Sequence, residues 1–256
     1  DLNDHYAQIS TDDYYVSPTI KHTTSSKNQI TFTTEDVYGA IAKLKKTATG
    51  PDSIPAWFLK LGIDFLSEPI TDMINTSIQH STVPLVWKRA RITPIEKIRS
   101  AKAPVDFRPI SITCINSRVT ERLIVRKLLQ PLISNNSAFN DQYAFRTTGS
   151  TTAAFIAITE LVTKTLETQH YVRMIALDFS KAFDTVKHHN LFEKLNQLNI
   201  PDNLYNWIID FYKDHCHTTL YNQIESSVKY INAGVIQGSA IGPTAFTIVA
   251  SDLKPV

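Results

Sequence analysis

The residues best suited to chemistry lie where a short apolar run ends in a carboxylate. The run VRMIALD (172–178) is typical of a buried strand, and it terminates at Asp178. A carboxylate at a strand end is costly unless it is paired, solvated in a cleft or bound to a metal ion. Asp178 is therefore a candidate metal ligand, with a simple turn-capping role as the alternative. Asp184, six residues on, fits an N-cap of the next helix at least as well as a catalytic role.

A glycine-rich segment, GVIQGSAIGP (234–243), is the second candidate. Its three glycines let the backbone approach a ligand closely, and Pro243 stands at the start of a predicted helix. The N–H groups at that helix start would favour a phosphate. The segment lacks the Lys-Ser/Thr pair of a P-loop, so by itself it also fits a packing turn.

Charge is unevenly distributed along the 256 residues, although the net charge is only +2. Residues 88–127 hold 11 basic and 3 acidic side chains, whereas both flanking segments are mildly acidic. This basic segment indicates a local polyanion site, with a solvated face that binds nothing as the alternative. The 43% hydrophobic content predicts a globular chain, and 2 cysteines exclude a disulfide scaffold. No apolar run is long enough for a membrane helix, so no membrane partner is expected.

Helices and strands must position these candidates. Apolar spacing predicts helices over 35–46, 70–78, 115–134, 151–167, 188–198, 202–213 and 241–253. Alternation predicts a strand over 89–97, in which Pro94 favours an edge position, and a hairpin over 218–234. The Ser/Thr-rich N-terminal residues are expected to form a leader that is flexible or ordered on contact. Because there is no regular βαβ rhythm, an α+β fold is predicted.

In their order along the chain, these segments resemble the reverse transcriptase domain of non-LTR (LINE-type) retrotransposons. The resemblance covers roughly residues 35–256. The motifs that carry it are TGPDSIP (49–55), WKRARITPI (87–95), FRPIS (107–111), QYAFR (142–146) with Ser150-Thr151, LDFSKAFDTV (177–186) and GVIQGSAIGP (234–243).

The resemblance implies roles for five residues of the palm. Asp178 matches the first catalytic aspartate, which holds two magnesium ions with help from the Phe179 carbonyl. Phe183 matches the aromatic residue that packs under the incoming sugar and disfavours a 2′-hydroxyl. Gln237 and Gly238 match the loop that lies against the nucleotide and the template. Two Mg²⁺ ions, or Mn²⁺ in their place, would suit the oxygen ligands.

The resemblance also implies roles in the fingers. Arg108, and less closely Lys97, match residues that contact the triphosphate, where cations neutralise the phosphate charge. Arg146 matches a motif residue whose implied role is template contact or finger packing. Both triphosphate candidates belong to the basic segment 88–127.

The sequence departs from the family at several positions. Ile236 stands where proline is usual, Ala144 where glycine is common, and Ser251 where asparagine is usual. The family's Tyr/Phe-x-Asp-Asp motif is absent, since Asp12-Asp13 in the leader is the one Asp-Asp pair. We therefore expect this chain in isolation to lack a full metal site and to be inactive. Primer extension by the 256-residue chain would contradict that expectation.

These observations predict a right-hand polymerase fingers region and partial palm, built as a small antiparallel sheet backed by helices, with the thumb absent. The expected division is a leader (1–34), fingers (35–165) and partial palm (166–256). The implied function is RNA-directed DNA synthesis from dNTPs at a primer 3′-end, in an intracellular setting, cytoplasmic or nuclear or both. The implied partners are an RNA template and a DNA primer. The alternative is a non-catalytic nucleic-acid-binding remnant of a decayed retroelement.

Overall fold

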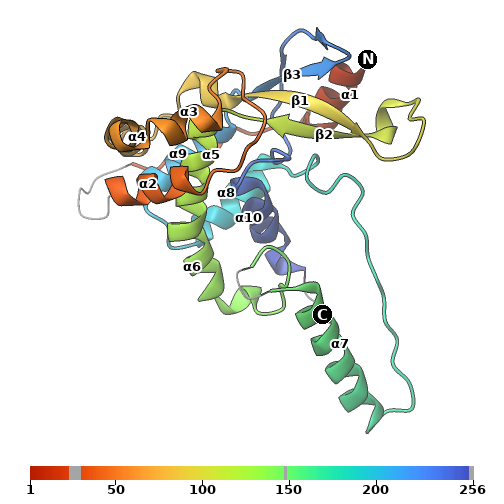
Figure 1. Ribbon diagram of the computed structural model, residues 1–256. Coiled ribbons are helices and arrows are strands. Elements are labelled where there is room, and N and C mark those ends of the chain that lie inside the picture. The colour runs from red at the N-terminus through yellow and green to blue at the C-terminus, as the bar shows by residue number, and fades with distance from the viewer. Residues whose placement is uncertain (23–29, 147–148, 254–256) are drawn as a thin grey trace.

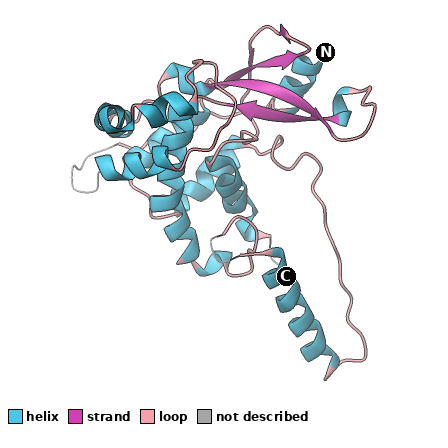
Figure 2. Cartoon of the chain, viewed as in Figure 1, coloured by secondary structure: helices cyan, strands magenta, loops and turns pink. Residues whose placement is uncertain are grey.

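The computed structural model describes residues 1–22, 30–146 and 149–253, and its architecture is α+β. Figure 2 shows a small sheet along one edge of a larger helical body. The α+β prediction is confirmed. The predicted leader falls partly on residues 23–29, which lie outside the described residues. The expected boundaries between leader, fingers and palm stay predictions.

The sheet combines a local hairpin with strands from a distant part of the chain. Strands β1 (Arg89–Glu96) and β2 (Phe107–Ile112) pair antiparallel, and β3 (Cys216–Tyr221) pairs parallel with β1. The short strands β4 (Ile224–Glu225) and β5 (Lys229–Tyr230) are antiparallel to β3. The small sheet is thus antiparallel in three of its four described strand pairings, as predicted, and the β1–β3 pairing is the parallel exception. A parallel neighbour requires a crossover connection, and helices between β2 and β3 supply it.

The helical body contains the helices that periodicity predicts, with shifted ends, and a short helix over 56–61 that periodicity does not predict. These are α2 (Thr34–Ala42), α3 (Ala56–Leu61), α4 (Ile63–Gln79), α5 (Ile115–Ile124), α6 (Gln130–Ser134), α8 (His188–Gln197), α9 (Asp202–Tyr212) and α10 (Ile241–Val249). A π-helical turn, η4 (Val125–Leu129), joins α5 to α6. Short 3₁₀ turns are η2 (Leu85–Lys88), η3 (Pro104–Asp106), η5 (Ser137–Phe139) and η6 (Ala250–Asp252).

The core extends through the helical body from α2 to α10, and α4 and α9 meet within it. Trp207 is fully buried and stacks on Phe211 with ring centroids 5.5 Å apart. The Trp207 indole N–H donates to the Ser77 hydroxyl of α4 at 2.9 Å, so its polar atom is satisfied despite burial. This contact fixes α9 against the N-terminal helices.

Helix α1 (Leu2–Ile9) was not predicted and packs against the strands on the β3 side of the sheet. The Asn3 side chain donates to the Ser227 carbonyl at 2.9 Å and accepts from the Thr219 hydroxyl at 2.8 Å. Tyr6 is 4% exposed. The helix is therefore held in place by its contacts with the sheet, which cover its buried face.

Helix α7 (Thr151–Leu166) and the chain after it extend away from the helical body (Figure 1). None of the α7 residues is buried, and the side chains of 171–180 are all exposed. The prediction of a buried strand over 172–178 is wrong. A strand needs neighbouring backbone N–H and C=O groups, and none of the described strands pairs with this segment. Among the described helices, none is long and apolar enough to traverse a bilayer.

Candidate active site

The glycine-rich loop 234–243 is tied directly to the hairpin that carries Arg108. The Ser111 amide of β2 donates to the Gln237 carbonyl at 2.8 Å. Gly238 follows with φ +112°, and a Cβ there would lie 2.5 Å from the Ser111 carbonyl oxygen. Only glycine fits this close approach without strain. The loop is thus fixed against the hairpin.

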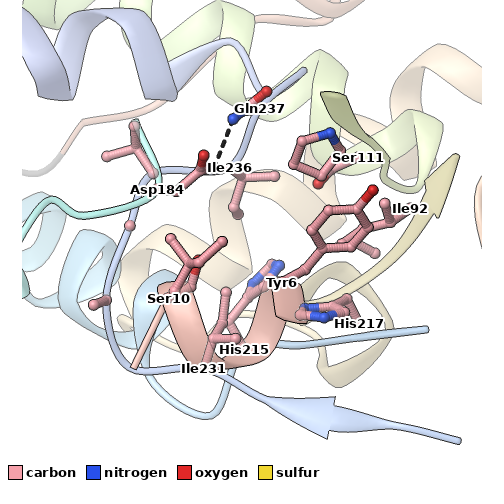
Figure 3. A pocket seen from close by; sticks show the side chains of 16 residues that line it. Tyr6, Ser10, Ile92, Ser111, Asp184, His215, His217, Ile231, Ile236 and Gln237 are labelled. Atoms are coloured by element: carbon pink, nitrogen blue, oxygen red, sulfur yellow. Dashed lines mark hydrogen bonds between the residues drawn. The ribbon is translucent and has the colours of Figure 1, made fainter. Parts of the chain in front are cut away.

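The same loop is hydrogen-bonded to the turn that contains Phe183 and Asp184. The Val235 amide donates to the Phe183 carbonyl at 2.7 Å. The Gln237 side-chain amide donates to Asp184 Oδ1 at 2.6 Å, as the dashed line in Figure 3 shows. Burial raises the pKa of Asp184, while the Gln237 hydrogen bond acts in the opposite direction. Asp184 does not cap α8, because Lys187 occupies the N-cap position.

Phe183 is the centre of an aromatic group that joins the motifs over 142–146 and 177–186 to α10. Its ring stacks on Phe246 of α10 at 5.1 Å and meets Phe145 edge-on at 6.1 Å. The next residue, Arg146, donates to the carbonyls of Phe139 and Gln142 and so closes the turn that presents Phe145. Phe145 and Phe246, about a hundred positions apart in the sequence, therefore contact the same ring.

Arg108 and Lys97 lie on the β1–β2 hairpin, and both are exposed. Arg108 stands opposite Ile95 in the β1–β2 register. The Lys97 amide donates to the Asp106 carbonyl at 2.8 Å, and its ammonium group donates to the Val105 carbonyl at 2.8 Å. Lys97 also lies close enough to Asp184 for its charge to lower that pKa. Lys97 therefore lies near the turn that contains Asp184, whereas the hydrogen bond that ties the hairpin to the loop 234–243 comes from Ser111 and not from Arg108.

A cavity of about 40 Å³ lies beside the Gln237–Asp184 contact. Figure 3 shows Tyr6 of α1 and the imidazoles of His215 and His217 around it. The Tyr6 hydroxyl has no hydrogen-bond partner within the described chain, and burial raises its pKa to about 12. The volume is enough for ordered water but not for a nucleotide.

Comparison with known proteins identifies the family. A family model described as "Reverse transcriptase (RNA-dependent DNA polymerase)" matches residues 97–254, which contain the motifs over 107–111, 142–146, 177–186 and 234–243 but not those over 49–55 and 87–95. The chain belongs to the reverse transcriptase family. The RNA-directed DNA polymerase from mobile element jockey of Drosophila melanogaster is 30% identical over 86% of this chain and 24% of its own length.

Two further relatives place this reverse transcriptase domain among non-LTR elements. The probable RNA-directed DNA polymerase from transposon BS of Drosophila melanogaster is 27% identical over 70% of the chain and 20% of its own length. The Pol polyprotein from the type-1 element R2 of Popillia japonica is 24% identical over 86% of the chain and 30% of its own length. The chain thus spans about a quarter of the length of these curated relatives.

Asp178 of the reverse transcriptase motif stands apart from this constellation. Its side chain is exposed and makes no hydrogen bond or ion pair within the described ranges. Phe179 beside it is 52% exposed. The structure therefore brings together Phe183, Gln237 and Gly238 with the Arg108 hairpin, but it does not place Asp178 in a cleft.

The oxygen donors near Asp178 decide whether a metal ion fits there. One carboxylate and the Phe179 carbonyl are hard ligands of the kind that Mg²⁺ prefers. Across residues 1–22, 30–146 and 149–253, no three His, Cys, Asp or Glu side chains converge on a common point. These residues do not by themselves fit the two-metal site of a polymerase, so no chemical step is derived through a metal ion.

A reverse transcriptase residue that sequence reasoning missed is Glu121 of α5. It is fully buried, and its carboxylate accepts from the Ser117 hydroxyl at 3.0 Å and from the Ala240 amide at 2.8 Å. Burial raises its pKa. The carboxylate thus holds the start of α10 and the loop before it. The one sequence signal was an acidic residue, four positions after Ser117, in an otherwise basic helix.

Proposed function

We propose that this chain provides the fingers region and part of the palm of an RNA-directed DNA polymerase that transfers dNTPs to a primer 3′-end on an RNA template. The observation that carries the proposal is the hydrogen-bonded union of the 183–187 turn, the 234–243 loop and β2. Three motifs of the reverse transcriptase family meet there. Two of the relatives are named RNA-directed DNA polymerases, which supports the same activity.

The proposed roles follow from the positions of the side chains. Arg108 and Lys97 would neutralise the triphosphate, because both cations are exposed on the hairpin that Ser111 ties to the loop 234–243. Phe183, held by Phe246, would form a rigid floor under the sugar. Gln237, with its side chain engaged by Asp184, would present the Gly238 backbone to the nucleotide.

Asp178 and the Phe179 carbonyl are proposed as metal ligands in the complete polymerase, with Mg²⁺ or Mn²⁺ as the ion. Arg146 is proposed to act by packing, since its guanidinium group is engaged by two carbonyls of its own turn. The proposed setting is intracellular, in the cytoplasm, the nucleus or both, where an RNA template and a DNA primer are available.

The test is primer extension by an extended polypeptide in which this chain is followed by the family's Tyr/Phe-x-Asp-Asp segment. We expect Asp178→Asn to abolish synthesis and leave RNA affinity unchanged, because the carboxylate is exposed and supports no fold contact. Asp72→Asn, an exposed carboxylate of α4, is the matched control and should leave both unchanged. Equal loss of synthesis and RNA binding in Asp178→Asn would show a structural role.

The second candidate is a nucleic-acid-binding protein without catalysis, and the isolated position of Asp178 favours it. The extended wild-type polypeptide separates the two candidates. Template-dependent incorporation of dNTPs supports the polymerase, whereas salt-sensitive RNA binding without incorporation supports the non-catalytic role.

A further inference from the structure

Helices α3 and α4, at one edge of the helical body (Figure 1), expose a group of large apolar side chains. Trp57 and Phe58 of α3 meet edge-on, with ring centroids 6.2 Å apart. Leu61 and Phe65 follow at helical spacing and are 79% and 84% exposed. These four side chains, which we call the apolar ridge, expose on the order of 500 Å². Patches of this size on a monomer are commonly sites of interaction.

The apolar ridge stands on a backbone that the fold holds in place. The Gly62 amide donates to the Phe58 carbonyl at 3.1 Å, and the Leu66 amide donates to the Gly62 carbonyl at 2.8 Å. Helical hydrogen bonding therefore crosses from α3 into α4. The opposite face of α4, which includes Ile70 and Ile74, is buried, and α4 packs against α2 and α9. A partner can cover the ridge without the entropic cost of ordering a loop.

Two carboxylates border the apolar ridge on the exposed face of α4. Asp64 and Glu68 are four residues apart, and each lies three residues after an apolar side chain of the ridge. In the part of the chain that the structure describes, neither carboxylate forms an ion pair or a side-chain hydrogen bond. The neighbouring cation, Lys60, instead donates to the Leu44 carbonyl at 3.1 Å. The surface thus combines apolar side chains with negative charge that its own cation does not offset.

This combination of chemistry distinguishes the possible occupants of the surface. A nucleic-acid strand can stack its bases on aromatic side chains, but Asp64 and Glu68 would repel its phosphates. A second copy of the same face, packed antiparallel, would bring the carboxylates of the two copies together, which is unfavourable. An amphipathic helix with Lys or Arg beside its apolar face would satisfy both the ridge and the carboxylates.

We infer that the apolar ridge and its two carboxylates form a docking surface for a basic amphipathic helix of another protein. The ridge buries the apolar face of that helix. Asp64 and Glu68 are separated by about 6 Å along the axis of α4, so they pair with two cations one turn apart on the partner. The surface lies outside the range 97–254 that matches the family model. It includes none of the residues proposed to hold the nucleotide, so its test does not depend on polymerase activity.

The test is fluorescence anisotropy of a labelled peptide about 18 residues long, titrated with the 256-residue chain. The peptide consists of leucine and lysine, placed so that its helix has one apolar and one basic face. The wild type should bind it, and should bind the same peptide with glutamate in place of lysine at least about tenfold more weakly. Leu61→Ala/Phe65→Ala should weaken binding of the basic peptide at least about tenfold. Phe155→Ala/Leu161→Ala removes the same two types of side chain from exposed positions of α7 and should change affinity less than about twofold.

A second pair of variants tests the carboxylates. Asp64→Lys/Glu68→Lys should bind the basic peptide at least about tenfold more weakly, because attraction is replaced by repulsion. Asp141→Lys/Glu167→Lys makes the same change in net charge at exposed carboxylates away from α3 and α4, and should change affinity less than about twofold. Equal losses in the two charge variants would show that the peptide responds to net charge alone and would overturn the inference.

The remaining arms examine folding and the other occupants. Circular dichroism checks that each variant is folded, and Trp57→Gln, at a residue that is 63% exposed, replaces the first pair if that pair unfolds. No binding of the basic peptide by the wild type, or equal losses in the ridge and α7 variants, would overturn the inference. A labelled oligouridine whose binding the ridge variant weakens would assign the surface to nucleic acid instead. A dimer in sedimentation that the ridge variant abolishes would assign it to a second copy.

Discussion

Three buried histidines predict that this protein loses stability steeply in mild acid. His188, His215 and His217 are all less than 5% exposed. Burial lowers the pKa of His188 to about 4, of His215 to about 3 and of His217 to about 4. In the unfolded chain each imidazole regains its ordinary pKa of about 6.5. The unfolded state therefore binds protons that the folded state refuses, and the stability present above pH 6.5 is lost as the pH falls toward 4.

The magnitude follows from proton linkage. Each histidine whose folded-state pKa lies below 5 contributes a loss of about 2 kcal/mol between pH 7 and pH 5, so three contribute about 6 kcal/mol. Burial raises the pKa of Glu121 and of Asp184, and these carboxylates act in the opposite direction because the folded state binds their protons more tightly. We expect a net loss of about 3–6 kcal/mol, a large part of a typical unfolding free energy of about 5–15 kcal/mol.

The assay is urea unfolding, followed by circular dichroism, at about pH 7 and about pH 5. His217→Gln removes one titrating group whose Nε2 has no partner, so the difference between the two pH values should shrink by about 2 kcal/mol. His80→Gln changes an exposed histidine and should leave the difference unchanged. The reasoning is refuted if the wild type is equally stable at both pH values, or if the two variants behave alike.

Two further substitutions test the loop 234–243. Glu121→Ala should lower the free energy of unfolding by about 3 kcal/mol, because the Ala240 amide loses its hydrogen-bond acceptor. Glu121→Gln should restore part of that free energy. Denaturant midpoints of Glu121→Ala that coincide with those of the wild type would contradict this reasoning. Gly238→Ala should cost about 1–3 kcal/mol and weaken dNTP binding, since its Cβ would press on the Ser111 carbonyl. Gly39→Ala in α2, where a Cβ meets nothing within 4 Å, should instead stabilise the fold, and equal shifts for both glycines would exclude a steric cause.

Much of the helical body could be predicted because helix formation is local. In α2, the Thr33 hydroxyl accepts from the Asp36 amide at 3.2 Å, an arrangement already indicated by the Thr-x-x-Asp spacing. The apolar positions of α9 lie at helical spacing, and burial of Trp207 follows from them. Alternation over 89–97 likewise predicted the strand β1, but not its partner β2, and β1 lies between β2 and β3 and not at an edge of the sheet.

The site was predictable only in part. Motif order in the sequence singled out Phe183, Gln237 and Gly238, and the structure joins them through the Ser111 and Asp184 contacts. Asp178 was also singled out, yet its exposed position could not be read from an apolar run. Whether such a run becomes a strand depends on a partner strand, which is a property of the fold and not of the segment.

The sequence by itself determined the family, most of the helices other than α1 and α3, and the basic character of residues 88–127, because motifs, periodicity and charge are carried by neighbouring residues. Only the tertiary structure decided that β3 lies parallel to β1, that Glu121 is buried beneath the 234–243 loop, and that cations of the α5–η4 helix and of the segment after α2 share one groove. Each of these joins residues far apart in the chain. Such contacts are selected by the total packing and hydrogen bonding of the folded protein, which no local pattern encodes.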